Sequence, residues 1–272
     1  MISKGSPQGI PFFYGGKEMS ATIKVMSFNI RCRVLKDGNN CQDFRKEKLL
    51  RMIRDEKPDL IGFQEVQDPS FAWLQEELPE YCILGHGRDA GYRGEFPPVA
   101  YRKDKFSLHA FREKWLSLQE DSPQSRLEGL DQSNCPRVYC CAELVHKDCD
   151  TPFAFYNIHT DHQGATARTV ECALLYRDIG QCGLPYVLTG DFNARPEEDC
   201  IRMILATGAK DLSENLGGTF HGFGRLEIPS KIDYVFTDLE EGDTPAYAVA
   251  DDDSCGCYYS DHNAVCAFVN LP

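Results

Sequence analysis

The sequence predicts an α+β fold in which two mixed β-sheets pack face to face and helices lie outside them. Apolar, strand-like runs recur along the whole chain, and helical stretches separate only some of them. Parallel neighbours need a long crossover connection, whereas runs that follow one another closely pair antiparallel, so the sheets should not be all-parallel. In such an architecture the ends of several strands can meet at one rim.

The N-terminal quarter of the chain is predicted to contain a leader, a strand, a helix and a second strand. Residues 1–20 lack the apolar segment of a secretory signal, and we expect them to form a flexible leader before a single domain over residues 21–272. The run "ATIKVMSFNIR" alternates and ends at Asn29, which predicts a core strand. Helical spacing follows, with Asp43 as the N-cap and Pro58 as the stop, and "PDLIGFQEV" predicts a buried strand ending at Glu65.

The later elements alternate between strands, helices and polar loops. We expect a short helix over residues 70–79, loops over 86–98, 119–136 and 212–230, strands over 99–111, 137–146, 152–162, 184–193, 231–236, 246–250 and 260–269, and helices over 164–179 and 197–207. Glu197, Glu198 and Asp199 are interpreted as charges in the first turn of the last helix, where the helix dipole favours acidic groups.

Composition narrows the class of protein. The chain of 272 residues is 42% hydrophobic and 26% charged, which is typical of a soluble globular protein with a large core, and no apolar run is long enough to cross a membrane. The net charge of −13 argues against a general nucleic-acid coat, because phosphate contacts need clustered Lys and Arg. The acidic excess lies in the second half of the chain, where it indicates either a site for divalent cations or a solvated face such as Asp251–Asp253.

The thirteen cysteines show no spacing typical of a zinc site. Their only clusters are Cys140-Cys141 and Cys255-x-Cys257, which we interpret as reduced thiols rather than metal ligands or disulfides. Together with the absence of a secretory signal, this predicts a cytoplasmic location.

Polar residues stand at the ends of several separate apolar strands. Taken singly, each has an ordinary explanation: Asn29 as a cap or turn residue, Glu65 as an exposed charge, His159 as a core histidine, and "GDFN" at residues 190–193 as turn chemistry. Asp233 could pair with Lys231, and "SDH" at 260–262 could cap a turn. Jointly these explanations are poor, because the chain has only 7 histidines and at least five apolar strands end this way. The pattern indicates one shared rim.

The ordered motifs "MSFNI", "FQEV", "YNIHTDH", "TGDFNA", "KIDYVF" and "YSDHNAV" resemble those of the endonuclease/exonuclease/phosphatase superfamily, which has the DNase I-like fold. The resemblance covers residues 21–270, and six motifs in this order are far more specific than any one of them. It implies a four-layer α/β/β/α sandwich and a metal-dependent phosphodiesterase or phosphatase.

The resemblance also implies a role for each motif residue. Mg²⁺ or Mn²⁺ would be bound by Glu65, with Asn29 and Asp261 beside it, because hard cations prefer oxygen ligands. Asp191 would activate the attacking water, and Asn193 would donate a hydrogen bond to the phosphoryl group. The expected catalytic set is completed by His262, which binds phosphate, by Asp233, which orients His262, and by His159, which contacts the phosphate or protonates the leaving oxygen.

Further residues are candidates for binding substrate. Asp161, Arg168 and His221 are expected to contact the substrate or support the site. Arg88 and Glu95, in the Gly-rich loop, could bind a phosphate or a sugar, or could form paired charges in a solvated loop.

The motifs indicate the chemistry better than the substrate. The expected partner is a phosphate ester of a nucleic acid, nucleotide or sugar, cleaved by a monomer that binds no membrane. The acidic charge disfavours duplex DNA, and "PSKIDYVF" replaces the Pro-x-Trp-Cys-Asp-Arg signature of inositol-polyphosphate phosphatases. A phosphodiesterase or nuclease and a small-molecule phosphatase both remain open. The alternative from another class is a non-catalytic phosphate- or nucleic-acid-binding protein on the same fold, which would show gaps in the motif set.

Overall fold

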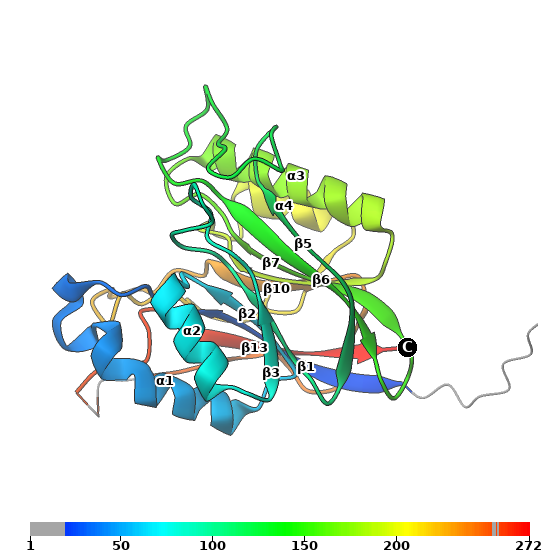
Figure 1. Ribbon diagram of the computed structural model, residues 1–272, viewed down its shortest axis with the longest axis horizontal. Coiled ribbons are helices and arrows are strands. Elements are labelled where there is room, and N and C mark those ends of the chain that lie inside the picture. The colour runs from blue at the N-terminus through cyan, green and yellow to red at the C-terminus, as the bar shows by residue number, and fades with distance from the viewer. Residues whose placement is uncertain (1–19, 252–253, 255) are drawn as a thin grey trace, which may run out of the picture.

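The computed structural model describes residues 20–251, 254 and 256–272, which form four layers in the order helices, sheet, sheet, helices (Figure 1). The predicted leader, apart from Ser20, lies outside the described residues, as do Asp252, Asp253 and Cys255. The helices are η1 (Leu35–Asn40), α1 (Gln42–Glu56), α2 (Asp68–Glu77), α3 (Ala165–Cys182) and α4 (Asp199–Ala206). No helix in this part of the chain is long and apolar enough to cross a membrane.

The first sheet carries α1 and α2 on its outer face (Figure 1). Its strands are β1 (Ala21–Asn29), β2 (Leu60–Gln64), β3 (Tyr81–Leu84), β4 (Val99–Arg102), β11 (Glu240–Glu241), β12 (Tyr247–Val249) and β13 (Ala264–Leu271). Their order is β11-β13-β1-β2-β4-β3, and β12 also pairs with β13. β1 and β2 run parallel, because α1 returns the chain between them, and the other pairs are antiparallel.

The second sheet carries α3 and α4 and has the order β5-β6-β7-β8-β10-β9. Its strands are β5 (Phe106–Trp115), β6 (Val138–His146), β7 (Pro152–His159), β8 (Tyr186–Asp191), β9 (Lys210–Asp211) and β10 (Asp233–Thr237). Only β7 and β8 pair parallel, and α3 connects them. Both sheets are therefore mixed, and the predicted four-layer fold is confirmed.

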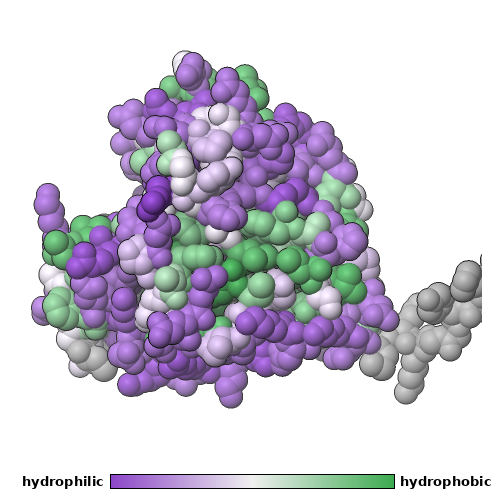
Figure 2. Space-filling model, in the orientation of Figure 1, coloured by the Kyte–Doolittle hydropathy of each residue, from purple (hydrophilic) through white to green (hydrophobic). Residues whose placement is uncertain are grey.

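Alternation along the strands divides the apolar side chains among three cores. On β1, Ile23 and Val25 face the other sheet, whereas Met26 and Phe28 pack under α1 and α2. A third core lies between the second sheet and α3 and α4. The inter-sheet core reaches the surface between the edge strands β3 and β5, where Figure 2 shows apolar side chains gathered in the middle of a mostly hydrophilic face.

Three predicted helix starts differ from the structure, and the first is that of α2, which begins at Asp68 rather than at residue 70. α1 begins at Gln42, with Cys41 in the N-cap position, so Asp43 lies in the first turn and pairs with Arg33 at 2.8 Å. α4 begins at Asp199, because the amide of Glu198 closes a turn onto the carbonyl of Arg195. Glu198 therefore precedes the helix.

Towards one end, the interface between the sheets changes from apolar to polar. Ser27, Gln64, Asn157 and Thr189 are fully buried there, and we call these four residues the polar seam. The Asn157 amide donates to the carbonyls of Phe63 and Pro98, at 2.6 and 3.0 Å. Its Oδ1 accepts from Gln64 at 2.8 Å and from Thr189 at 3.0 Å. These bonds join the two sheets, and buried amides left without them would cost free energy.

Gly62 on β2 lets the sheets approach at the polar seam. A Cβ at this position would lie 1.9 Å from Thr189 Oγ1 and 2.5 Å from Asn157 Oδ1. We expect Gly62→Ala to lower the free energy of unfolding by about 2–3 kcal/mol, because overpacking forces these side chains apart. Chemical denaturation followed by circular dichroism measures this change.

The matched control is Gly180→Ala in α3, where an added Cβ meets nothing within 4 Å. This substitution should raise stability by about 0.5–1 kcal/mol, because alanine favours a helix over glycine. Equal effects of the two substitutions would contradict the role assigned to Gly62.

Candidate active site

The strand-end residues meet at the polar end of the two sheets. Register in the second sheet places His159 on β7 and Asp233 on β10 on either side of Asp191, the last residue of β8. β1 ends in the facing sheet at Asn29, whose side-chain amide donates to Asp191 Oδ2 at 2.9 Å. One hydrogen bond thus connects the two sheets at the rim.

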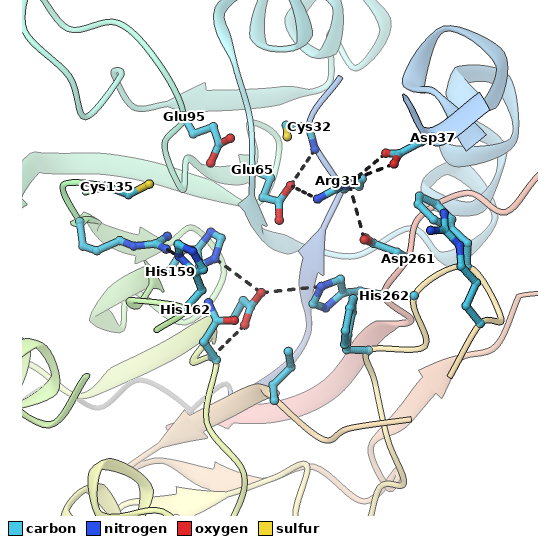
Figure 3. Close-up of a pocket in the computed structure, with 18 of the residues that line it drawn as sticks. Arg31, Cys32, Asp37, Glu65, Glu95, Cys135, His159, His162, Asp261 and His262 are labelled. Atoms are coloured by element: carbon cyan, nitrogen blue, oxygen red, sulfur yellow. Dashed lines mark hydrogen bonds and ion pairs between the residues drawn. The ribbon is translucent and has the colours of Figure 1, made fainter. Parts of the chain in front are cut away.

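The Asp191 carboxylate lies between two histidines, His159 and His262. Figure 3 labels both histidines. Its Oδ2 is 3.6 Å from His159 Nε2 and 3.8 Å from His262 Nε2. Its Oδ1 accepts the backbone N–H of Asn193 at 2.9 Å. Burial, and then the charge of Asp233, raise the pKa of Asp191 to about 7, so this carboxylate can take up a proton near neutral pH.

His262 is held by Asp233 on the side away from Asp191. Its Nδ1 lies 2.8 Å from Asp233 Oδ2, which also accepts the Thr219 hydroxyl at 2.5 Å. Burial favours the neutral imidazole, but the charge and hydrogen bond of Asp233, assisted by Asp191, raise the pKa of His262 to about 10. Nδ1 therefore donates to Asp233, and Nε2–H faces Asp191.

The His159 imidazole, unlike that of His262, is neutral. Burial, and then the charges of Arg137 and Arg88, lower the pKa of His159 well below its ordinary value. The two histidines that face Asp191 thus differ in charge, one neutral and one protonated.

Glu65 and Asp261 bring two further carboxylates to the rim, and Arg31 lies between them (Figure 3). The Arg31 guanidinium is 3.7 Å from Glu65 Oε2 and 3.6 Å from Asp261 Oδ2, and it also pairs with Asp37 at 3.1 Å. Burial opposes ionisation of Glu65, but Arg31, the Cys32 amide and other neighbours lower its pKa below the usual value. The pair of carboxylates already attracts a cation.

Only two of the three residues predicted to bind a metal present oxygen atoms suited to a hard divalent cation. Glu65 and Asp261, which both lie beside the Arg31 guanidinium, offer the carboxylate oxygens that Mg²⁺ or Mn²⁺ prefers. Asn29 presents nitrogen instead, because its Oδ1 accepts the N–H of Arg31 at 2.9 Å while its amide donates to Glu65 at 3.2 Å and to Asp191. The amide is therefore placed to orient both carboxylates.

A different cluster of three residues also brings possible metal-ligand atoms close together. Among the described residues, ligand atoms of Asp191, Asp233 and His262 lie within 4.8 Å of one another. We favour Glu65 and Asp261, because His262 Nδ1 is engaged by Asp233 and is protonated, and a protonated imidazole cannot bind a metal.

Backbone strain accompanies these positions. Arg31, Glu65 and Asn193 all have left-handed backbone, with φ of 54°, 58° and 45°. Such conformations are costly for residues other than glycine and concentrate at functional sites. The Asn193 amide donates to the carbonyl of Thr160 at 3.0 Å, which fixes the side chain beside Asp191.

The predicted substrate-binding residues divide into two groups. Arg88 and Glu95 pair at 3.1 Å and line a cavity of about 500 Å³ that also includes His159, Asp191, Asn193, Asp261 and His262. Asp161, Arg168 and His221 do not line this cavity, and their assigned roles stay predictions. Asp161 accepts from Ser133, Gln163 and Gly164, Arg168 pairs with Glu198, and His221 packs on Tyr258.

Sequence reasoning did not find several residues that line the cavity. Arg31, Arg137, His162 and Phe220 are examples. Arg31 could have been predicted from the sequence, because it lies two residues after Asn29 at the same strand end. Arg137 and Phe220 lie in or beside long loops, where arginine and aromatic residues are common for many reasons.

A family model described as the endonuclease/exonuclease/phosphatase family matches residues 26–262. The chain belongs to this family. The predicted resemblance is therefore confirmed, and members of the family are largely hydrolases of phosphoester bonds that typically use a divalent metal.

Solved structures agree with this assignment, and one curated relative is also similar in sequence. An endonuclease/exonuclease/phosphatase from Bacteroides vulgatus is 30% identical, with a TM-score of 0.86 over 93% of this chain and 100% of that chain. A mannosyl-6-phosphatase from Bacteroides thetaiotaomicron is 28% identical, with a TM-score of 0.79 over 91% and 99% of the two chains. The uncharacterized protein L388 of Acanthamoeba polyphaga mimivirus is 23% identical over 210 residues, which is 71% of this chain and 78% of that protein.

The bridging amide of Asn29 gives a stability prediction. Asn29→Asp replaces a donor with a third carboxylate between Glu65 and Asp191, so we expect the free energy of unfolding at pH 7.5 without divalent metal to fall by about 2–3 kcal/mol. Denaturation in chelator measures this change. The control is Asn134→Asp, which makes the same change at an exposed residue beside Arg126. An unchanged stability of Asn29→Asp would contradict the bridging role.

Proposed function

We propose that this protein is a divalent-metal-dependent hydrolase that cleaves a phosphoric ester of a small organic molecule. The observation that carries this proposal is the Asp191 carboxylate, held between two imidazoles and connected through Asn29 to Glu65. This arrangement offers a proton acceptor, hydrogen-bond donors and a cation-binding pair of carboxylates within one cavity.

Each residue has a role that its contacts support. Glu65 and Asp261 would bind the metal, which when bound would polarise a phosphoryl oxygen. Asp191 would accept the proton of the water that attacks phosphorus in line with the leaving oxygen. His262 Nε2–H would donate to a phosphoryl oxygen, and Asp233 would keep that imidazole charged and oriented. His159, being neutral, is better suited to a hydrogen bond with the phosphate than to protonating the leaving group.

Three observations favour a small substrate over a polymer. The cavity volume of about 500 Å³ is in the range of small-molecule sites. The net charge of −13 disfavours a long anionic strand. The similar mannosyl-6-phosphatase has a name that specifies a sugar phosphate. We therefore propose a phosphomonoester of the sugar-phosphate class as the substrate.

The roles of Asp191 and His262 predict large losses of activity. With Mg²⁺ and the best ester from a panel of sugar phosphates, nucleotides and bis-p-nitrophenyl phosphate, we expect Asp191→Asn and His262→Asn to lower kcat/KM by about 10²–10⁴-fold. The controls are Asp199→Asn and His109→Asn, which alter exposed residues on α4 and β5. Full activity of either site variant would contradict its role, and no turnover by the wild type on any ester would favour a binding protein.

The role of Glu65 predicts a specific defect in metal binding. Glu65→Gln should raise the Mg²⁺ concentration needed for half-maximal thermal stabilisation by on the order of 10–100-fold, because a neutral amide binds a hard cation poorly. Differential scanning fluorimetry across a Mg²⁺ titration measures this without turnover. Glu47→Gln on the exposed face of α1 is the control. An unchanged titration of Glu65→Gln would place the metal elsewhere.

A further inference from the structure

One wall of the cavity carries a guanidinium that the proposed reaction does not use. Arg137 immediately precedes β6 and lines the cavity together with His162 and Arg88. Its side chain is only 3% exposed, yet Nε and Nη1 have no hydrogen-bond partner among the described residues. Guanidinium nitrogens can act only as donors, and leaving them buried and unpaired is costly. Because Arg137 lines the cavity, an acceptor bound there would approach the guanidinium from that side.

The acidic neighbour of Arg137 does not satisfy it. Asp161 Oδ2 lies 3.7 Å from Arg137 Nε, which is beyond hydrogen-bond distance. The Asp161 carboxylate already accepts N–H groups of Ser133, Gln163 and Gly164 and the Ser133 hydroxyl. Asp161 therefore stabilises the charge of the guanidinium without taking up its hydrogen-bond donors.

His162 holds the third guanidinium nitrogen. Arg137 Nη2 lies 2.9 Å from His162 Nδ1, and since arginine can only donate, Nδ1 is the acceptor. The His162 proton is then on Nε2. Arg88, whose Nε also lacks a partner within the described part of the chain, completes this wall.

The field at this wall is positive. Burial, and then the charge of Arg137, lower the pKa of the His162 imidazole, and Asp161 opposes this less strongly. At His159 the charges of Arg137 and Arg88 act in the same direction. A group that binds here should therefore be an anion rather than a neutral hydroxyl.

We propose that Arg137, with His162 and Arg88 beside it, forms a second anion subsite that binds an acidic group of the substrate other than the phosphate that is cleaved. The inference rests on the proposed function, because it extends the same cavity. Guanidinium N–H groups form charge-assisted hydrogen bonds with an oxygen of a carboxylate or a phosphate, and Nη1 is the Arg137 nitrogen that neither His162 nor Asp161 engages. The substrate class is thereby narrowed to phosphate esters that carry a second carboxylate or phosphate.

Matched phosphonates test the subsite without turnover, because their C–P bond is not an ester. The probes are alkylphosphonates with chains of two to six carbons that end in methyl, carboxylate or a second phosphonate. Isothermal titration calorimetry in Mg²⁺ gives the Kd of each. We expect the wild type to bind at least one of the two acid-ended series about 10–100-fold more tightly than the methyl-ended series, as for a charge-assisted hydrogen bond. The series that shows the preference identifies carboxylate or phosphate.

Variants assign the preference to Arg137. Arg137→Gln should equalise the Kd values of the acid-ended and methyl-ended probes when both are measured on that variant, and His162→Ala, at an exposed residue, should reduce the preference without risk to the core. Arg202→Gln, which removes an exposed arginine of α4, should keep it. His162→Ala is decisive if Arg137→Gln does not fold.

Two results would overturn the subsite. The first is equal binding of all three series by the wild type, and the second is a preference that survives in both Arg137→Gln and His162→Ala. In either case the methyl-ended probes still bind and the proposed function stands. If no phosphonate binds and no ester is hydrolysed, the proposed function fails and the subsite fails with it.

Discussion

The hydrogen bonds across the polar end of the two-sheet interface are the constraint on which the rest of the site depends. Apolar side chains between two sheets tolerate small slides, because dispersion and the hydrophobic effect have little direction. The amide of Asn157 does not tolerate them, since it must reach main-chain carbonyls of the facing sheet from a fully buried position. Asn29 and Asp191 lie at the end of this seam, so their 2.9 Å contact follows from the register of the two sheets.

A buried arginine fixes the loops that leave the rim. Arg45 of α1 is fully buried, and its guanidinium donates to the carbonyls of Ile30, Arg31 and Tyr259, at 2.6, 2.5 and 2.8 Å. The first two carbonyls belong to the segment that carries Arg31, and the third precedes Asp261 by two residues. A charge at this depth is tolerable only because carbonyl oxygens surround it. It thereby sets the distance between two segments that are far apart in sequence.

Much of the site could be predicted from the sequence, because the end of a buried strand is recognised where an apolar run stops at a polar residue. Apolar runs that stop at Asn29, Glu65, His159 and Asp191 indicate both the strand and the polar group at its end. Arg45 and Arg137 could not be found in this way, because arginine in a helix or loop is usually solvated and its burial depends on segments distant in sequence. Asp161 and Arg168 show the converse. They share a local pattern with the rim residues, but neither lines the cavity, and the structure pairs Asp161 with Ser133 and Arg168 with Glu198.

The mixed pairing of β8 explains why a sheet of this topology can present two imidazoles in different states. Parallel pairing with β7 brings the carboxyl end of that strand, and so His159, beside Asp191. Antiparallel pairing with β10 brings an amino end, and so Asp233, to the other side of Asp191. Asp233 raises the pKa of His262 and so keeps its imidazole protonated. Burial and the charges of Arg137 and Arg88 lower the pKa of His159 and so keep that imidazole neutral. An all-parallel sheet would put only carboxyl ends at this rim, and the carboxylate at the start of β10 that holds His262 would then lie at the opposite edge.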